Sequence, residues 1–178
     1  EKFNIDVHLG ETVSADTIID KKYDEVILAT GIVPRNPDIP GIDHPKVLSY
    51  IDVIQKKKPV GKKVAIIGAG GIGFDVAEYL AHGKVNSSLD KMAFMEEWGI
   101  DTTLKARGGI KDIAPKFEAS PREISLLQRK TTKVGAGLGK TTGWIHRTNL
   151  TRKGVDMING VEYKKIDDSG LHYLLNNE

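Results

Sequence analysis

The chain has 178 residues, which is enough for one domain or for one domain and part of a second. Lysine and arginine total 26 against 24 aspartate and glutamate, so the formal net charge of +2 gives no electrostatic reason to expect nucleic acid or an anionic membrane as a partner. The absence of cysteine excludes disulfides, thiolate zinc sites and iron–sulfur ligation within these residues.

We expect neither a signal peptide in the first residues nor a membrane span. Residues 1–6 have neither the basic start nor the apolar core of a signal peptide, and no apolar run approaches the roughly 18 residues of a membrane span. We therefore expect a cytoplasmic protein that does not enter a membrane. A first residue other than Met and an end directly after an apolar run indicate a piece of a longer polypeptide.

Two strands are predicted near the N-terminus. Residues 5–9 alternate apolar and polar side chains, and residues 23–31 form an apolar run that ends in the small residues Ala29, Thr30 and Gly31, as chain does when it passes close to a ligand. Residues 12–19 are ambiguous. Four prolines between positions 34 and 45 predict an extended loop between two domains, after which Ser49 is expected to cap a short helix.

The central motif is a strand, a glycine turn and a helix. Residues 63–67 predict a buried strand, and residues 74–81 space apolar side chains as a helix does. Between them, Gly68 suits a tight turn, Gly70 admits a pyrophosphate, and Gly73 lets the helix pack on the strand. We predict a dinucleotide with its pyrophosphate on the helix N-terminus, the alternative being a glycine-rich turn without chemical use. The predicted contacts are Gly68, Ala69, Gly70, Gly71, Ile72 and Gly73.

The second half of the chain predicts the rest of a nucleotide-binding domain. Residues 83–121 form an excursion with one short helix around 91–97. A strand at 123–128, a helix capped by Thr141 or Thr142 that ends at Gly154, a strand at 155–158 and a hairpin of 161–167 with 171–175 follow. This order predicts an α/β, Rossmann-like, three-layer domain with a parallel sheet and an antiparallel hairpin, without its last return strand.

The end of the second strand selects the cofactor. An NAD site has Asp or Glu there, about 20 residues past the glycines, to bind the ribose 2′-hydroxyl. This chain has Gln128, Arg129 and Lys130, farther along because of the excursion. A neutral amide followed by cations suits a 2′-phosphate, so we predict NADPH. The alternative is a solvated pair of cations at a strand end.

Three other kinds of site are rejected. Gly139, Lys140 and Thr141 match the end of a P-loop, but Val134 stands where its first glycine is required. The five histidines have no ligand spacing, so no metal site is expected. The paired carboxylates suit a helix surface and a turn, and no catalytic acid or base is assigned.

Several runs resemble the bacterial NADPH-dependent 2,4-dienoyl-CoA reductases of the NADH:flavin oxidoreductase family. They are residues 27–35, 41–50, 71–75, 126–130 and 137–147. In that family an N-terminal barrel holds FMN and a [4Fe–4S] cluster, and an NADPH domain is inserted in a C-terminal FAD domain. Electrons pass from NADPH to FAD, the cluster, FMN and the dienoyl-CoA of unsaturated fatty acid oxidation.

The resemblance implies a domain division and roles for single residues. Residues 1–58 become a partial FAD-binding segment with its linker, and residues 59–178 a C-terminally truncated NADPH-binding domain with its excursion at about 83–121. Ala29, Thr30 and Gly31 are placed near the flavin, and Arg129 with Lys130 on the 2′-phosphate. Asp75 stands where many relatives have Glu and helps to place the nicotinamide, although an exposed first-turn acid is the simpler account.

The implied partner is the barrel domain of the same polypeptide, which lies outside these residues, so the fragment alone is not expected to turn over substrate. Two alternatives stay open. One is another barrel-bearing relative, such as an enoate reductase or amine dehydrogenase. The other is a non-catalytic adenine-nucleotide-binding module.

Overall fold

The structure is a computed structural model that describes residue 3, residues 5–83 and residues 87–175. It divides into two compact units, residues 1–36 and residues 37–178. The predicted boundary after residue 58 concerns membership in the FAD and NADPH domains and stays a prediction. Residues 37–58 nevertheless lie in the same compact unit as the sheet described below.

Among its described residues, the first unit contains one short helix, α1 (Ala15–Asp20). Ser14 caps it, because its Oγ accepts a hydrogen bond from the backbone N–H of Thr17 at 3.2 Å. The predicted strands at 5–9 and 23–31 are wrong, since the described residues of this unit contain no strand. Alternation marks a chain able to pair, but a strand forms only when another strand takes up its backbone hydrogen bonds.

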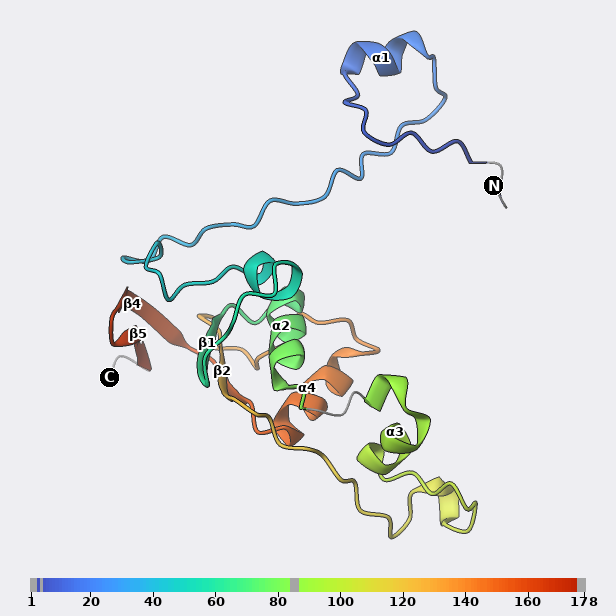
Figure 1. The fold of residues 1–178 in the computed structure, drawn as a ribbon, viewed down its shortest axis with the longest axis vertical. Coiled ribbons are helices and arrows are strands. Elements are labelled where there is room, and N and C mark those ends of the chain that lie inside the picture. Colours follow the sequence, from blue (N-terminus) through green and yellow to red (C-terminus); the bar gives the residue numbers. More distant parts are fainter. Residues whose placement is uncertain (1–2, 4, 84–86, 176–178) are drawn as a thin grey trace. The chain divides into compact units, whose positions relative to one another are not determined.

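The second unit is built on a three-stranded parallel sheet in the order β1, β2, β3. Figure 1 labels the first two of these strands. The strands are β1 (Lys63–Ile67), β2 (Glu123–Leu127) and β3 (Asp156–Ile158), and Ala65 lies opposite Ser125, which lies opposite Asp156. Helix α2 (Gly71–Ala81) follows β1, and α4 (Gly143–Arg152) joins β2 to β3. The predicted α/β class with a parallel sheet is confirmed.

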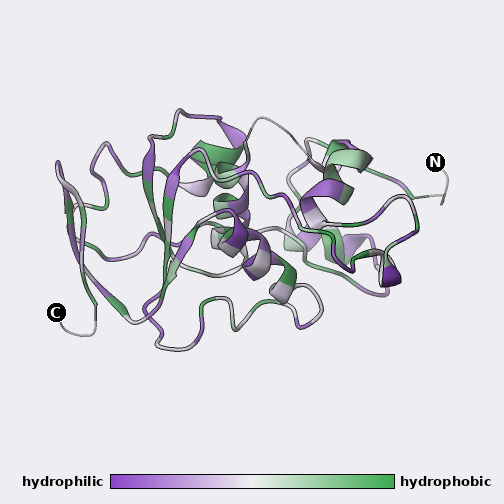
Figure 2. Ribbon diagram, turned by 90° about the horizontal axis from the view of Figure 1, so that it is seen from below, coloured by the Kyte–Doolittle hydropathy of each residue, from purple (hydrophilic) through white to green (hydrophobic). Residues whose placement is uncertain are grey.

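The core lies where α2 packs against the sheet and against α4. Phe74 and Leu80 of α2 are buried with Ile124 and Leu126 of β2 and Leu150 of α4. Each such side chain contributes about 1.5–3 kcal/mol by leaving water. Figure 2 shows apolar stretches in the central helices and strands. This packing fixes the N-terminus of α2 at the carboxyl ends of β1 and β2.

A single turn of π-helix, η1 (Ile51–Gln55), precedes β1. Its N-cap is Tyr50 and not the expected Ser49. Ser49 lies one residue earlier and still binds the first turn: Ser49 Oγ accepts from the Asp52 N–H at 3.1 Å, and Asp52 Oδ2 accepts from the Ser49 N–H at 3.1 Å. Val53 of this turn is buried in the core beside α2. The segment before β1 therefore covers part of the core of the second unit.

The predicted antiparallel hairpin is confirmed as β4 (Val161–Asp167) and β5 (Gly170–Leu175), with an irregularity between Tyr163 and Lys165. It also contacts the proline-rich segment. The Ile166 N–H donates to Pro40 O at 2.8 Å, and a side chain on Gly41 would come within 2.0 Å of Ile166 O. Glycine at position 41 therefore permits this close approach.

The excursion contains η2 (Ser87–Leu89), α3 (Lys91–Trp98) and η3 (Arg107–Gly109); its residues 84–86 lie outside the described residues. It is attached to the end of α4. The guanidinium of Arg152 lies 4.5 Å from the Phe117 ring and 5.5 Å from the Trp98 ring. Lys153 Nζ forms a buried ion pair with Glu97 Oε1 at 3.1 Å. The predicted helix around 91–97 is confirmed as α3.

Candidate dinucleotide site

The glycine turn has the geometry that close packing requires. Gly68 has a φ of +105°, which favours glycine, and its N–H donates to Leu127 O at 2.9 Å. A Cβ on Gly73 would lie 2.0 Å from Gly68 O. Gly68 therefore makes the turn and Gly73 permits the helix to start against it, as the sequence predicts.

Gly70 has a different reason to be glycine. Its φ of −85° suits other residues, and a Cβ built there meets no atom within 4 Å. Gly70 is the N-cap of α2 and has no side chain to accept a hydrogen bond. Phe74 is the first residue of the helix whose backbone N–H has a backbone acceptor, Gly70 O at 3.1 Å. The earlier amides of α2 are donors for an anion, and the open space at Gly70 lets that anion approach the backbone.

The loop after β2 begins beside this turn, because Gly68 is hydrogen-bonded to the residue before Gln128. The Gln128 side chain is not turned outward as a free donor. Its Nε2 donates to Lys130 O at 3.0 Å and to Thr132 O at 2.8 Å. Gln128 thus shapes the loop, and its side-chain oxygen remains available to a ligand.

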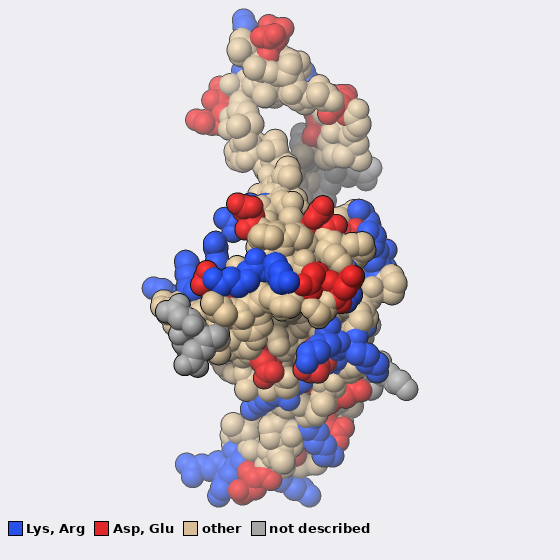
Figure 3. Space-filling view, turned by 90° about the vertical axis from the view of Figure 1, so that its left-hand side faces the viewer, with Lys and Arg blue, Asp and Glu red and all other residues tan. Residues whose placement is uncertain are grey.

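The loop is strongly cationic. Arg129, Lys130 and Lys133 are exposed, and none of them forms an ion pair with a described residue. Between residues 124 and 155 the sequence has seven lysines and arginines and no aspartate or glutamate. Figure 3 shows acidic and basic side chains interspersed over one face of the molecule. An anion that reaches this loop therefore meets uncompensated positive charge.

Tyr163 of β4 contributes a buried hydroxyl. This hydroxyl makes no hydrogen bond of ordinary length and angle with a described residue, although the backbone of Gly68 lies close to it. Burial raises the pKa of Tyr163, while the Arg129 guanidinium and the backbone of Gly68 act in the opposite direction. The hydroxyl therefore lies near both the glycine turn and the cationic loop, where a ligand oxygen could accept its proton in a hydrogen bond.

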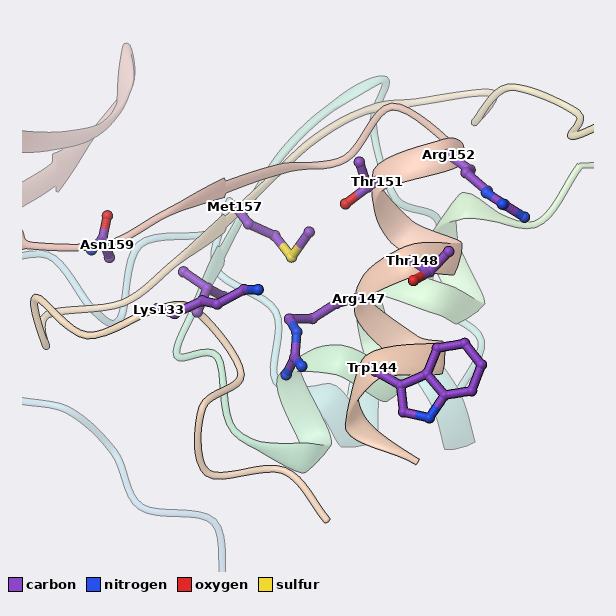
Figure 4. A pocket seen from close by; sticks show the side chains of 9 residues that line it. Lys133, Trp144, Arg147, Thr148, Thr151, Arg152, Met157 and Asn159 are labelled. Carbon is purple, nitrogen blue, oxygen red and sulfur yellow. The ribbon is translucent and has the colours of Figure 1, made fainter. Parts of the chain in front are cut away.

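A pocket of about 520 Å³ is lined by residues of this loop, of α4 and of β3 with its end. Figure 4 shows Lys133, Arg147 and Met157 pointing toward one another inside it. Arg147 Nη1 donates to Gly135 O at 2.9 Å, which holds that guanidinium in place. The lining is Lys133, Val134, Trp144, Arg147, Thr148, Thr151, Arg152, Met157 and Asn159.

The predicted site residues are divided between the two units: the glycine turn, Asp75 and residues 128–130 belong to the second, and residues 29–31 to the first. The glycine turn and the residues from Gln128 to Lys130 come together at the ends of β1 and β2. Asp75 is exposed on the first turn of α2. Ala29, Thr30 and Gly31 lie in the first unit, in exposed chain without helix or strand.

Sequence reasoning missed Asn159, Tyr163 and Lys133. Asn159 and Tyr163 lie far from the glycines in sequence, and only the pairing of β3 with β2 and the return of β4 bring them near. Lys133 had a local signal, because it follows Arg129 and Lys130 in a stretch without acids. Within the described residues no group of three His, Asp or Glu could hold a metal ion, and no helix there has the length and apolarity to cross a bilayer.

The fold and the site define a nucleotide-binding α/β protein. The chain belongs to the pyridine nucleotide-disulphide oxidoreductase family, whose model matches residues 1–178. Its homologues are oxidoreductases, and the family suggests FAD and NAD(P)H as cofactors.

Individual relatives agree with this family. A cinnamate reductase from Clostridium sporogenes is 42% identical over 76 residues, which are 43% of this chain and 11% of that protein. An NADH oxidase from Thermoanaerobacter brockii is 38% identical over 140 residues, 76% of this chain and 21% of that protein. A solved 2-naphthoyl-CoA reductase in complex with 2-naphthoyl-CoA has the same fold, with a TM-score of 0.62 and 22% identity over 98% of this chain and 21% of that one. The chain thus spans about a tenth to a fifth of these relatives.

Proposed function

We propose that this chain is the NADPH-binding part, with a segment of the FAD domain, of a flavin-dependent reductase. In this proposal residues 59–178 bind NADPH, and residues 1–58 belong to the FAD domain and its linker. The full polypeptide reduces a 2,4-dienoyl-CoA in unsaturated fatty acid oxidation. A barrel domain of the same polypeptide, with FMN and an iron–sulfur cluster, completes it.

One observation supports NADPH binding above the others: the glycine turn and the cationic loop are joined by the hydrogen bond from Gly68 to Leu127 O. NADPH carries a pyrophosphate and a 2′-phosphate, which are linked through the adenosine ribose. Its binding site therefore needs two neighbouring anion sites. The amides at the start of α2 serve the first, and Arg129 with Lys130 the second. A hydrogen bond to a charged group contributes about 1.5–3 kcal/mol, less at exposed positions, so two such contacts favour NADPH over NADH by about two decades or less.

The chemistry of the full enzyme belongs to its cofactors. Bound NADPH supplies the hydride that reduces a flavin. The residues of this chain bind and orient: α2 holds the pyrophosphate, Asp75 lies on the turn where the nicotinamide half leaves the helix, and Ala29, Thr30 and Gly31 belong to the flavin side. No residue of the chain is assigned a proton transfer.

The substrate class rests on resemblance. The runs shared with 2,4-dienoyl-CoA reductases span most of the chain, and two of the similar proteins are, by their names, reductases of cinnamate and of 2-naphthoyl-CoA. All three substrates are conjugated carboxylic acid derivatives. The open alternative is therefore an enoate reductase relative.

Calorimetric titration of the 178-residue chain with NADPH, NADH and ADP at two salt concentrations tests the nucleotide proposal. We expect NADPH to bind much more tightly than NADH, with an advantage that shrinks as salt rises. Equal affinity for all three ligands would instead favour an adenine-nucleotide-binding module. For the substrate, the full polypeptide should oxidise NADPH with a 2,4-dienoyl-CoA faster than with cinnamate, and the reverse order would favour the enoate reductase relative.

A further inference from the structure

Side-chain amides hold three successive carbonyl groups in the loop after β2. Gln128 Nε2 donates to Lys130 O at 3.0 Å and to Thr132 O at 2.8 Å, and Asn159 Nδ2 donates to Thr131 O at 2.6 Å. The Gly160 N–H adds a second donor to Lys130 O at 3.1 Å. The end of β3 and the end of β2 therefore fix the loop from one side.

This arrangement turns the loop's amides away from those donors. The described residues contain no cis peptide bond, and in a trans peptide the N–H points opposite to the C=O of the same plane. Because Lys130 O and Thr132 O meet at one nitrogen, the N–H groups of Thr131 and Lys133 point away from it. The Thr132 N–H points away from Asn159 for the same reason. None of these three amides donates to a described residue.

Three free amides lie in a part of the chain that also supplies side-chain donors. Thr131, Thr132 and Lys133 are exposed, and the two hydroxyls and the ammonium group lie on the same residues as the free amides. Arg129 and Lys130 precede them, and the nearest acidic residues in sequence are Glu123 and Asp156. Successive N–H groups next to uncompensated cations suit a phosphate group.

We infer that the backbone amides of Thr131, Thr132 and Lys133 form the cradle for the 2′-phosphate of NADP(H), and that Asn159 and Gln128 position it. This inference rests on the proposed function and extends it. Arg129 and Lys130 alone would give attraction without a fixed geometry. The held loop gives three donors whose directions are set before the ligand arrives, which lowers the entropy cost of binding.

The test is a nuclear magnetic resonance titration of the ¹⁵N-labelled 178-residue chain. The probes are adenosine 2′,5′-bisphosphate and adenosine 5′-monophosphate, which differ only in the 2′-phosphate, followed by NADPH. We expect the bisphosphate to shift the amide signals of Thr131, Thr132 and Lys133 downfield, and the monophosphate to leave them in place. NADPH should shift these signals together with those of Gly70 to Gly73.

A pair of variants tests the positioning role. Asn159→Ala removes the donor to Thr131 O, and we expect it to weaken the bisphosphate about fivefold, as for one lost hydrogen bond, with little change for the monophosphate. Asn149→Ala, on α4, is the matched control, because the Asn149 side chain makes no hydrogen bond with a described residue. Equal effects of the two variants would overturn the role of Asn159.

The remaining outcomes separate the inference from the proposed function. If NADPH shifts Gly70 to Gly73 and leaves residues 131–133 unchanged, the cradle is wrong and NADPH binding stands. If the bisphosphate shifts residues 131–133 but NADPH does not bind, the loop binds phosphate and the proposed function fails. If no probe shifts either segment, both fail.

Discussion

Gly70 and Gly73 offer a test that separates a glycine kept for a ligand from a glycine kept for packing. A Cβ at position 73 would lie 2.0 Å from Gly68 O, whereas a Cβ at position 70 meets nothing within 4 Å. We therefore expect Gly70→Ala to fold normally and to lose NADPH, and Gly73→Ala to lose both stability and NADPH. Gly61→Ala is the control, because its Cβ also meets nothing and it precedes the site.

The magnitudes follow from the surroundings of each glycine. Alanine at position 73 gains up to about 1 kcal/mol of helix propensity, but overpacking against backbone costs about 1–3 kcal/mol and at 2.0 Å more than that. Alanine at position 70 loses a few tenths of a kcal/mol as a helix cap and regains about 0.4–1 kcal/mol through the unfolded chain, so its net effect is near zero. At about 2–4 °C per kcal/mol, only Gly73→Ala should lower the melting temperature by several degrees.

Differential scanning calorimetry and NADPH titration of the three variants provide the measurement. The methyl group at position 70 occupies the space through which a pyrophosphate approaches the amides of α2, so binding should fall by a factor of 10 or more, on the order of one lost charged hydrogen bond. Unchanged NADPH affinity in Gly70→Ala would refute the placement of the pyrophosphate. An unchanged melting temperature in Gly73→Ala would refute the packing argument.

Three further predictions concern other residues. Arg129→Ala should weaken NADPH about tenfold or more and NADH little, with the exposed Arg107→Ala as control, and titration should show no such split if Arg129 does not face the 2′-phosphate. Lys153→Met leaves Glu97 buried without its partner and should cost about 3–5 kcal/mol in urea unfolding, more than an exposed pair does. Hydrogen bonds from the Thr103 hydroxyl and nearby backbone amides lower the pKa of Asp101 to about 2, so hydrogen exchange in residues 101–106 should speed up only as pH falls from about 4 toward 2.

The pH dependence of the Glu97 pair has a definite sign. Burial acts to raise the pKa of Glu97, but the Ser87 hydrogen bond and the Lys153 ion pair outweigh it, so the pKa is lowered. A carboxyl with a lowered folded pKa stabilises the protein above its unfolded pKa of about 4.3, and that stability is lost as pH falls through the folded pKa. We therefore expect the contact between the excursion and the end of α4 to weaken as the pH falls through the folded pKa of Glu97.

The local parts of the fold could be predicted from the sequence. A short apolar run, three spaced glycines and a helical pattern locate β1, the turn and α2, because each depends on contacts between near neighbours in the chain. The hairpin could be predicted for the same reason. The strands predicted at 5–9 and 23–31 depend on partner strands, which neither the alternation of the first nor the apolar run of the second supplies.

In the loop after β2, only the cations could be predicted from the sequence. Arg129 and Lys130 follow a recognisable strand end, but the donors that hold their loop come from Gln128, whose side chain turns back, and from Asn159, which the third strand brings alongside. Lys153 shows the same limit. Lysine is typical of surfaces, and only the docking of α3 buries this one beside Glu97.

The charge distribution favours a ligand at the cationic loop over simple solvation. The chain as a whole is nearly neutral, yet residues 124–155 have seven cations and no acid. Three of the seven are used within the fold: Lys153 pairs with Glu97, Arg152 lies over two rings and Arg147 donates to Gly135 O. The other four are exposed and flank the loop after β2: Arg129, Lys130, Lys133 and Lys140. Like charges this close repel one another in the free protein, and a bound phosphate relieves that repulsion. A loop at a strand end that only faced water would need no such excess of positive charge.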